Sequence, residues 1–274
     1  MKSQTIRRPA VAGKFYADEP RLLREDVEQH IRGAGEGEAS ARVACIIAPH
    51  AGYPYSGATA GHAYARAATS KPKRVILLGC SHHYEFSGAC VANQGAFETP
   101  LGNLAIDEAF ATELQGDMEQ QDLTPHVPEH SLEVHLPFIQ VAFGDVEIVP
   151  VLFGSRYSSW HGAFARKLAA IAEPTDLLVA STDLSHFHTD AKARAKDQQS
   201  LEYLMAKDTD ALIKASEEGR CSMCGITAVI TACIYALERD AFDWNLLDYR
   251  TSAETSGDFS RVVGYAAVSM EQAQ

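Results

Sequence analysis

Three short polar segments that contain histidine each follow an apolar run of strand length. The residues are His50 after VACIIA, His82 and His83 after VILLGC, and His186 and His188 after LLVAS. Asp183 lies in the third segment. In open α/β sheets, ligands bind beyond the carboxyl ends of the strands. Three strands that deliver histidine to that edge therefore indicate one functional site.

These residue types favour metal chemistry. Neutral imidazole is a ligand for zinc, iron, copper and nickel, and two histidines with one carboxylate hold the iron of non-haem Fe(II) oxygenases. Hydrolytic zinc sites also use three protein ligands and leave a position for water. The pattern is typical of a mononuclear metal centre with a further histidine as acid or base. The alternative is a metal-free, hydrogen-bonded cluster of histidine and aspartate.

A second polar cluster occupies residues 128–137, with the sequence PEHSLEVHLP. His130 and Glu133 are three residues apart, so they share one face if a helix begins there. His130 either contributes to the pocket or caps that helix together with Ser131. For His135 we favour packing on the buried side of the helix.

Two further segments have both a functional and a structural interpretation. Cys221 and Cys224 open an expected helix, where the helix dipole lowers a thiol pKa. A single C-x-x-C pair without a second pair is a weak redox or zinc signal, so we favour a packed helix start. The polar stretch 249–258 precedes the last expected strand, and it either adds a carboxylate to the pocket or forms a plain surface loop.

Apolar runs of strand length alternate with longer amphipathic segments along the whole chain. This alternation predicts an α/β fold with a mostly parallel central sheet flanked by helices, in a single domain over residues 1–274. Expected strands cover 43–48, 75–79, 88–93, 146–153, 177–181 and 262–268, and expected helices cover 21–32, 58–69, 107–115, 131–143, 158–172, 191–206, 208–218 and 225–238.

The composition excludes several classes of protein. The 274 residues have a formal net charge of −12 and lack long basic runs, which argues against nucleic acid as a partner. The chain has no apolar stretch long enough to span a bilayer and no secretory signal, so we expect no membrane association. Six cysteines within mostly apolar runs suit reduced thiols in the cytoplasm. No glycine-rich phosphate loop follows a strand, so a nucleotide is not indicated.

Several motifs resemble those of the Memo family, whose prokaryotic members are called AmmeMemoRadiSam system protein B. The motifs are RRPAVAGKFYADEP, APHAGYPYSGATAGHAY, LLGCSHHY, FETPLG, EHSLEVHLPF, STDLSHF, the pair Cys224-Gly225 and VVGYAA. They run in family order over nearly the whole chain.

The resemblance implies a fold like that of the class III extradiol, LigB-type dioxygenases. It implies that His50 and His82 are metal ligands and that His186, beside Asp183, is the acid/base histidine. The dioxygenases complete the ligand set with a glutamate near the C-terminus, where animal Memo has a cysteine. This chain has Glu254 in that neighbourhood, so the resemblance leaves two candidates for the third ligand, Glu254 and, as a substitute, Asp183. The resemblance also implies a functional association with a radical-SAM protein.

The leading hypothesis is therefore a cytoplasmic, metal-dependent oxidoreductase that acts on an unknown small-molecule substrate. Fe(II) or Cu is the expected cofactor, and zinc is the weaker candidate. His186, Asp183 and His130 are the candidate acid/base residues, and His50, His82, Asp183 and Glu254 are the candidate ligands. The alternatives are a non-catalytic metal-binding or accessory protein that retains the pocket, and a metal-dependent hydrolase.

Overall fold

The computed structural model describes residues 5–35, 41–116, 118 and 123–272, and it has an α/β fold. Four parallel strands form the centre of the main sheet in the order β2-β8-β3-β7. They are β2 (Arg42–Ala48), β8 (Asp176–Ser181), β3 (Arg74–Cys80) and β7 (Glu147–Phe153). Nearly every residue of these strands is buried, as their continuous apolar sequences require for a sheet covered on both faces.

Antiparallel strands complete both edges of this sheet, so it is mixed and not mostly parallel as expected. On one side, β11 (Val262–Gln272) pairs with β2 and with β10 (Asp243–Thr251), and its first residues pair with β9 (His186–His188). On the other side, β4 (Ala89–Val91) pairs with β7. The expected strand 262–268 is present as part of β11. It runs antiparallel to β2, and it follows β10 through a short connection and not through a helical crossover of the kind that joins parallel strands.

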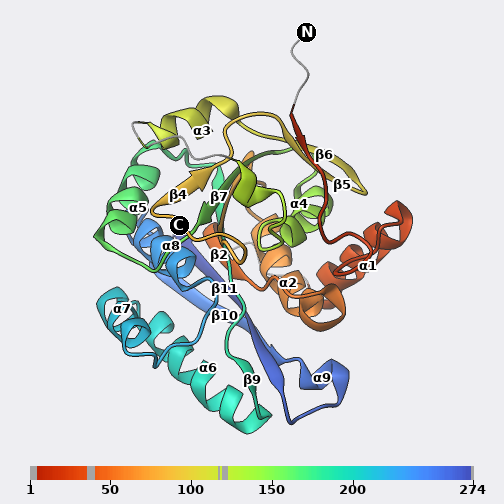
Figure 1. Ribbon diagram of the computed structural model, residues 1–274, viewed down its shortest axis with the longest axis vertical. Helices are drawn as coiled ribbons and strands as arrows, with labels where there is room; N and C mark the ends of the chain where they lie inside the picture. Colours follow the sequence, from red (N-terminus) through yellow and green to blue (C-terminus); the bar gives the residue numbers. More distant parts are fainter. Residues whose placement is uncertain (1–4, 36–40, 117, 119–122, 273–274) are drawn as a thin grey trace.

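Two groups of helices cover the sheet (Figure 1). In one group α2 packs on β2, β10 and β11, with α1 and α4 against it. In the other group α8 packs on β2, β3 and β8, with α5 and α7 against it, while α6 lies along β10 and β11. The helices are α1 (Pro20–Gly33), α2 (Tyr53–Ala68), α3 (Glu108–Gln115), α4 (Leu136–Phe143), α5 (Ser159–Ile171), α6 (Asp190–Met205), α7 (Thr209–Glu217), α8 (Ile226–Glu238) and α9 (Ala253–Ser256).

A small second sheet holds the start of the described chain, with β5 (Ala96–Thr99) between β1 (Ile6–Arg7) and β6 (Gly102–Ala105). Beside it, the helix expected over 131–143 is divided into a short 3-10 helix, η2 (Glu133–His135), and α4. Glu133 explains this local structure, because its buried carboxylate accepts hydrogen bonds from Arg7, from the Tyr16 hydroxyl and from two backbone amides, at Ala10 and Val11. Another 3-10 helix, η1 (Thr124–His126), precedes this segment.

No helix within the described parts of the chain is long and apolar enough to cross a membrane.

Candidate metal centre

The carboxyl ends of β2, β8 and β3 lie next to one another at one edge of the sheet, with β8 in the middle. His50 follows the end of β2 and His82 follows the end of β3, each by two residues. Their ring centroids are 5.2 Å apart. The parallel centre of the sheet thus brings two histidines that are distant in sequence to one place.

His50 is held in a single tautomer when it is neutral. Its ring is buried, and Nδ1 lies 2.7 Å from the hydroxyl oxygen of Ser181 at the end of β8. That hydroxyl uses its one proton to donate to the carbonyl oxygen of Ser131, 2.5 Å away, so it accepts from Nδ1–H of His50. The lone pair of His50 is therefore on Nε2, the nitrogen that points to Cys224.

His82 is oriented in the same way by a carboxylate. Nδ1 of His82 lies 2.8 Å from Oε1 of Glu129, and the backbone amide of His82 donates to Oε2 at 2.6 Å. Glu129 is buried and also accepts from the backbone amides of His130 and Ser131. Because an ionised carboxylate only accepts, Nδ1 of His82 carries the proton and Nε2 is left as a donor atom for a ligand.

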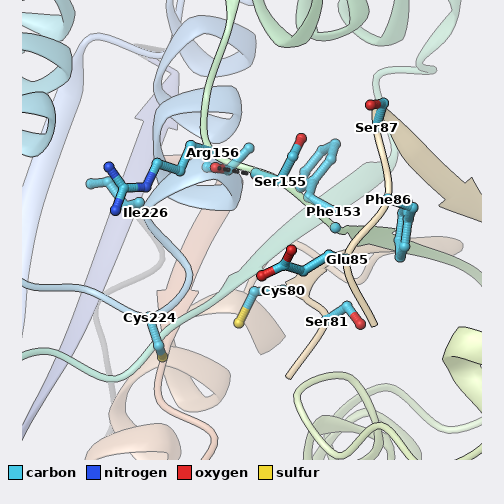
Figure 2. Close-up of a pocket in the computed structure, with 12 residues that line it drawn as sticks. Cys80, Ser81, Glu85, Phe86, Ser87, Phe153, Ser155, Arg156, Cys224 and Ile226 are labelled. Atoms are coloured by element: carbon cyan, nitrogen blue, oxygen red, sulfur yellow. Dashed lines mark hydrogen bonds between the residues drawn. The ribbon is translucent and has the colours of Figure 1, made fainter. Parts of the chain in front are cut away.

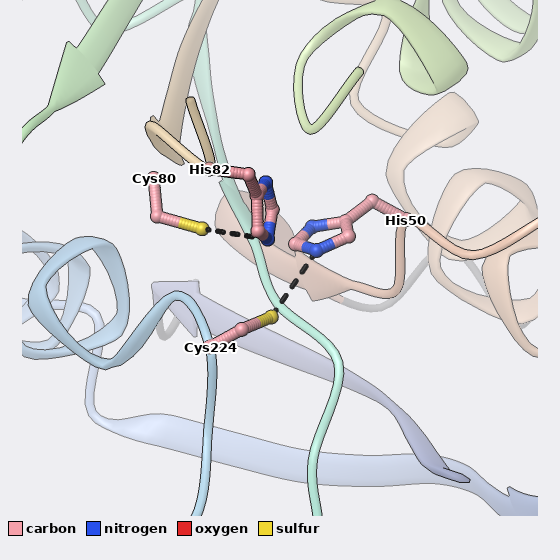
Figure 3. A group of neighbouring side chains, drawn as sticks. All are labelled: His50, Cys80, His82 and Cys224. Atoms are coloured by element: carbon pink, nitrogen blue, oxygen red, sulfur yellow. Dashed lines mark hydrogen bonds between the residues drawn. The ribbon is translucent and has the colours of Figure 1, made fainter. Parts of the chain in front are cut away.

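Two cysteine sulfurs complete a compact group with these imidazoles (Figure 3). Cys80 is the last residue of β3, and Cys224 lies just before α8. Sγ of Cys224 is 3.1 Å from Nε2 of His50, and Sγ of Cys80 is 3.6 Å from Nε2 of His82. One ligand atom from each of the four residues lies within 4.8 Å of the other three.

The donor set fits a single transition-metal ion. A tetrahedral ion with bonds of about 2.0–2.3 Å to nitrogen and sulfur places its ligand atoms roughly 3.3–3.8 Å apart. The two nitrogen–sulfur separations of 3.1 and 3.6 Å are close to this range. Thiolate and imidazole are ligands of Cu(I), zinc and iron, and hydrogen bonds on the far ring nitrogens are the usual support of metal-binding histidines.

The electrostatics of the group favour a thiolate at Cys224. A hydrogen bond with Cys80 and the neighbouring charge of His50 hold the pKa of Cys224 well below its usual range, against the effect of burial. The hydrogen bond with Cys224 and burial raise the pKa of Cys80 in turn.

The same charges act on the two histidines. Burial lowers the pKa of His50, but the charges of Cys224 and Asp183 outweigh burial and raise that pKa to about 9. For His82, burial is likewise outweighed by hydrogen bonds with Cys224 and Glu129, which raise its pKa to about 10. Without a metal, both rings therefore hold a second proton at neutral pH, and a metal must displace it.

His130 lies beside this group but has the opposite electrostatic character. Its ring stacks on His82 with centroids 4.6 Å apart and meets His50 edge-on at 5.5 Å. Burial and the neighbouring charge of His50 lower the pKa of His130 to about 4. His130 is therefore neutral at physiological pH, unlike the rings of His50 and His82 in the metal-free protein.

Two cavities open onto the donor group. One, of about 600 Å³, has Cys80 and Cys224 in its wall together with Glu85, Phe86 and Arg156 (Figure 2). The other, of about 630 Å³, shares Arg156 and Cys224 with the first and is also lined by His186. A small molecule can thus reach the two sulfurs from solvent.

The remaining predicted site residues lie at different distances from the donor group. Asp183 is buried, and its carboxylate accepts a hydrogen bond at 2.8 Å from the backbone amide of His50. Glu254, on α9, forms an ion pair with Arg194 on α6 at 3.1 Å, and its side chain is 44% exposed. Among the described residues, neither Asp183 nor Glu254 belongs to the group of donor atoms.

The sequence interpretation did not single out Cys80, Glu129 or Ser181, and it considered Cys224 only as part of a C-x-x-C pair and of a family motif. The preference for a packed helix start at Cys224 is not what the structure favours, because the thiol faces His50 and not the helix interior. A glycine is the signal that points to its role. A Cβ atom on Gly225 would lie 2.1 Å from the carbonyl oxygen of Ser181, so only glycine lets this loop approach the end of β8.

Comparisons with known proteins identify relatives over nearly the whole chain. The family model described as "Memo-like protein" matches residues 7–269. A MEMO1 family protein of Methanopyrus kandleri is 36% identical and aligns over 96% of this chain and 98% of its own length. A MEMO1 family protein of Methanothermobacter thermautotrophicus is also 36% identical, over 96% of this chain and 100% of its own.

Among solved structures, an uncharacterized protein of Escherichia coli K12 has a TM-score of 0.49 and 13% sequence identity to this chain. The overlap covers 84% of this chain and all of that protein.

Proposed function

We propose that this chain, which belongs to the Memo family, is a metalloprotein that holds one transition-metal ion between His50, His82 and Cys224. The observation that carries the proposal is the orientation of both imidazoles. Ser181 and Glu129 occupy the Nδ1 atoms, so both Nε2 atoms are directed to the cysteine sulfurs. Cys224, with Cys80 as a fourth donor, takes the place for which Asp183 and Glu254 were the candidates.

Iron or copper is the metal class that we propose, because the function that we infer is oxidoreductase chemistry related to the extradiol dioxygenases. A redox-active metal in this position supplies electron transfer and binding of dioxygen or of a substrate oxygen. Thiolate ligands favour Cu(I) over harder ions.

The side chains around the metal position have separate roles in this proposal. Glu129 and Ser181 hold the two histidine ligands in place. His130, neutral and stacked on His82, accepts a proton from the substrate. His186, in the wall of the second cavity, is the alternative proton acceptor, and it interacts electrostatically with Asp183. The small-molecule substrate enters through the cavities that share Arg156.

A metal-dependent hydrolase is the second candidate, and one observation favours it. Two histidines and one cysteine, here His50, His82 and Cys224, are also a donor set of catalytic zinc, and a zinc ion held by three protein ligands would keep a fourth position for the water that it activates. The identity of the retained metal distinguishes the two candidates. If the protein retains the metal but catalyses no reaction, the non-catalytic metal-binding or accessory protein is the better description.

Metal content of protein purified without oxygen tests the proposal. After incubation with Fe(II), Cu(I) and Zn(II) in separate samples and removal of free ion, we expect one metal per chain. The double variant His50→Ala/His82→Ala should retain none, whereas His83→Ala, at the exposed neighbouring position, should bind as the wild type does. Equal metal content in the wild type and the double variant would overturn the proposed site.

The cellular setting is a proposal as well. Reduced thiols at the site require a reducing compartment, so we place the protein in the cytoplasm. The family resemblance suggests that it acts together with a radical-SAM protein, in a sequence of reactions on a shared small molecule. Co-purification of the two proteins, or a change of metal content when the partner is deleted, would test this association.

A further inference from the structure

The two cysteines of the donor group, Cys80 and Cys224, lie in the wall of one cavity, although they are far apart in the sequence. Cys80 ends a central strand of the sheet and Cys224 lies in the loop before α8 (Figures 2 and 3). Their sulfur atoms lie within 4.8 Å of one another, and both residues line the cavity of about 600 Å³. Both are partly exposed, so a reagent in solution can reach them.

The other cysteines have different surroundings. Cys45, Cys90 and Cys233 are buried in the core. Cys221 is only three residues from Cys224 and lines the second cavity with it, but among the described residues it does not belong to the group of donor atoms. The local C-x-x-C spacing would pair Cys221 with Cys224, whereas the fold pairs Cys224 with Cys80.

We propose that Cys80 and Cys224 form a reversible disulfide when no metal is bound, and that this disulfide closes the site to metal. Formation of the disulfide does not depend on the proposed function. The claim that the disulfide excludes metal does rest on the proposed function, because sulfurs that are bonded to each other are no longer available as thiolate ligands.

The oxidant is a small-molecule disulfide such as oxidised glutathione. The Cys224 sulfur attacks one sulfur of the reagent, which breaks the reagent's S–S bond and releases one glutathione thiol. The Cys80 sulfur then attacks the Cys224 sulfur of the mixed disulfide and releases the second glutathione. The two protein thiols lose two electrons and two protons, and the reagent disulfide gains them.

Formation of the disulfide requires only a limited movement of the two sulfur atoms. A disulfide has an S–S bond of about 2.05 Å, so the two sulfurs must approach by at most roughly 2.8 Å. Cys224 lies in a loop, where side-chain rotation and a small backbone shift are compatible with this approach. The cavity beside the two sulfurs leaves room for the reagent during the first step.

Peptide mapping of the oxidised, metal-free chain is the test. The full-length protein is stripped with a chelator, incubated with oxidised glutathione, alkylated under native conditions and digested without reductant. We expect a cross-linked peptide pair that contains Cys80 and Cys224, with the two thiols recovered after reduction. The variant Cys221→Ser should give the same cross-link, and Cys80→Ser should give glutathione bound to Cys224 instead.

Two results would overturn the inference. One is a Cys221–Cys224 cross-link in the wild type, and the other is a native protein in which Cys80 and Cys224 are both still free to be alkylated after prolonged oxidation. In a second arm, metal is added to the disulfide form before and after reduction, and we expect uptake only after reduction. If the cross-link forms but the reduced protein takes up no metal, the proposed metal site fails while the disulfide stands. If metal is taken up but no cross-link forms, the disulfide alone fails.

Discussion

The proposed metal site depends on the single atoms that orient the two histidines. Glu129 is the most important of them, because one buried carboxylate holds the ring of His82 and three backbone amides of the surrounding loop. Burial raises the pKa of this carboxyl, but the hydrogen bonds and charge of His82 outweigh burial and lower the pKa to about 2. Glu129 is therefore ionised at every pH at which the protein is expected to work.

We predict that Glu129→Gln weakens metal binding by about 10–100-fold, the usual cost of losing such a supporting group. The amide has nearly the same shape as the carboxylate but lacks its charge and presents only one acceptor oxygen. Competition with a chelator of known affinity measures the change. Glu85→Gln is the matched control, because Glu85 is an exposed acidic residue in the wall of the cavity that contains Cys80 and Cys224. Equal affinities of Glu129→Gln and wild type would contradict the role of Glu129.

The pH dependence of metal binding follows from the two raised histidine pKa values of about 9 and 10. Below these values each ring carries a proton that the metal must displace, so affinity should fall as the pH is lowered from 10 to 7. Each displaced proton contributes up to about tenfold per pH unit. Affinity measured by competition at several pH values checks this, and an affinity independent of pH over that interval would contradict it.

At the scale of elements, the site depends on how closely the loop before α8 approaches β8. We predict that Gly225→Ala displaces Cys224, because the added Cβ would lie 2.1 Å from the carbonyl oxygen of Ser181. The variant should lose metal binding and about 1–3 kcal/mol of unfolding free energy. Gly33→Ala, at the end of α1 where a Cβ meets nothing within 4 Å, should leave metal binding unchanged and should not lower the unfolding free energy. Urea unfolding and metal titration of both variants give the comparison, and an unaffected Gly225→Ala protein would refute the packing argument.

The helices and strands also explain which site residues could be placed from the sequence and which could not. His50 and His82 could be placed together because long apolar strands predict a parallel sheet, and the carboxyl ends of parallel strands meet at one edge. Cys224 could not be placed, since no local pattern shows that the start of α8 packs on the end of β8. Cys80 was not recognised as a ligand candidate, because it is the last residue of an apolar strand sequence. The strand β10 was missed because its sequence DWNLLDYRT mixes acidic and apolar residues, as an edge strand can.

The same limit applies to the carboxylates. Glu254 was a ligand candidate because it lies shortly before the last strand. In the structure it lies on α9, where its carboxylate forms an ion pair with Arg194. Glu129 was part of a segment expected to begin a helix. The buried pairing of Glu133 with Arg7 instead holds that segment in short turns, and this lets Glu129 reach His82.

At the scale of the whole molecule, we propose that residues 1–274 fold as one domain. A large, continuous cluster of buried apolar residues joins the strands of the main sheet to the helices on both of its sides. We predict a single cooperative unfolding transition, with its midpoint raised by metal. The gain is about 2.7 kcal/mol when the free metal concentration is 100 times its dissociation constant. Calorimetry with and without metal tests this, and two separate transitions in the metal-free protein would contradict the single domain.

The central claim is a metal bound by both nitrogen and sulfur, and X-ray absorption spectroscopy of the metal-loaded protein tests it most directly. The account predicts imidazole nitrogens at about 2.0–2.1 Å and at least one sulfur at about 2.3 Å. The sulfur contribution should decrease in Cys224→Ser and remain unchanged in Cys221→Ser. A first coordination shell of oxygen and nitrogen alone, or a spectrum that Cys224→Ser leaves unaltered, would contradict it.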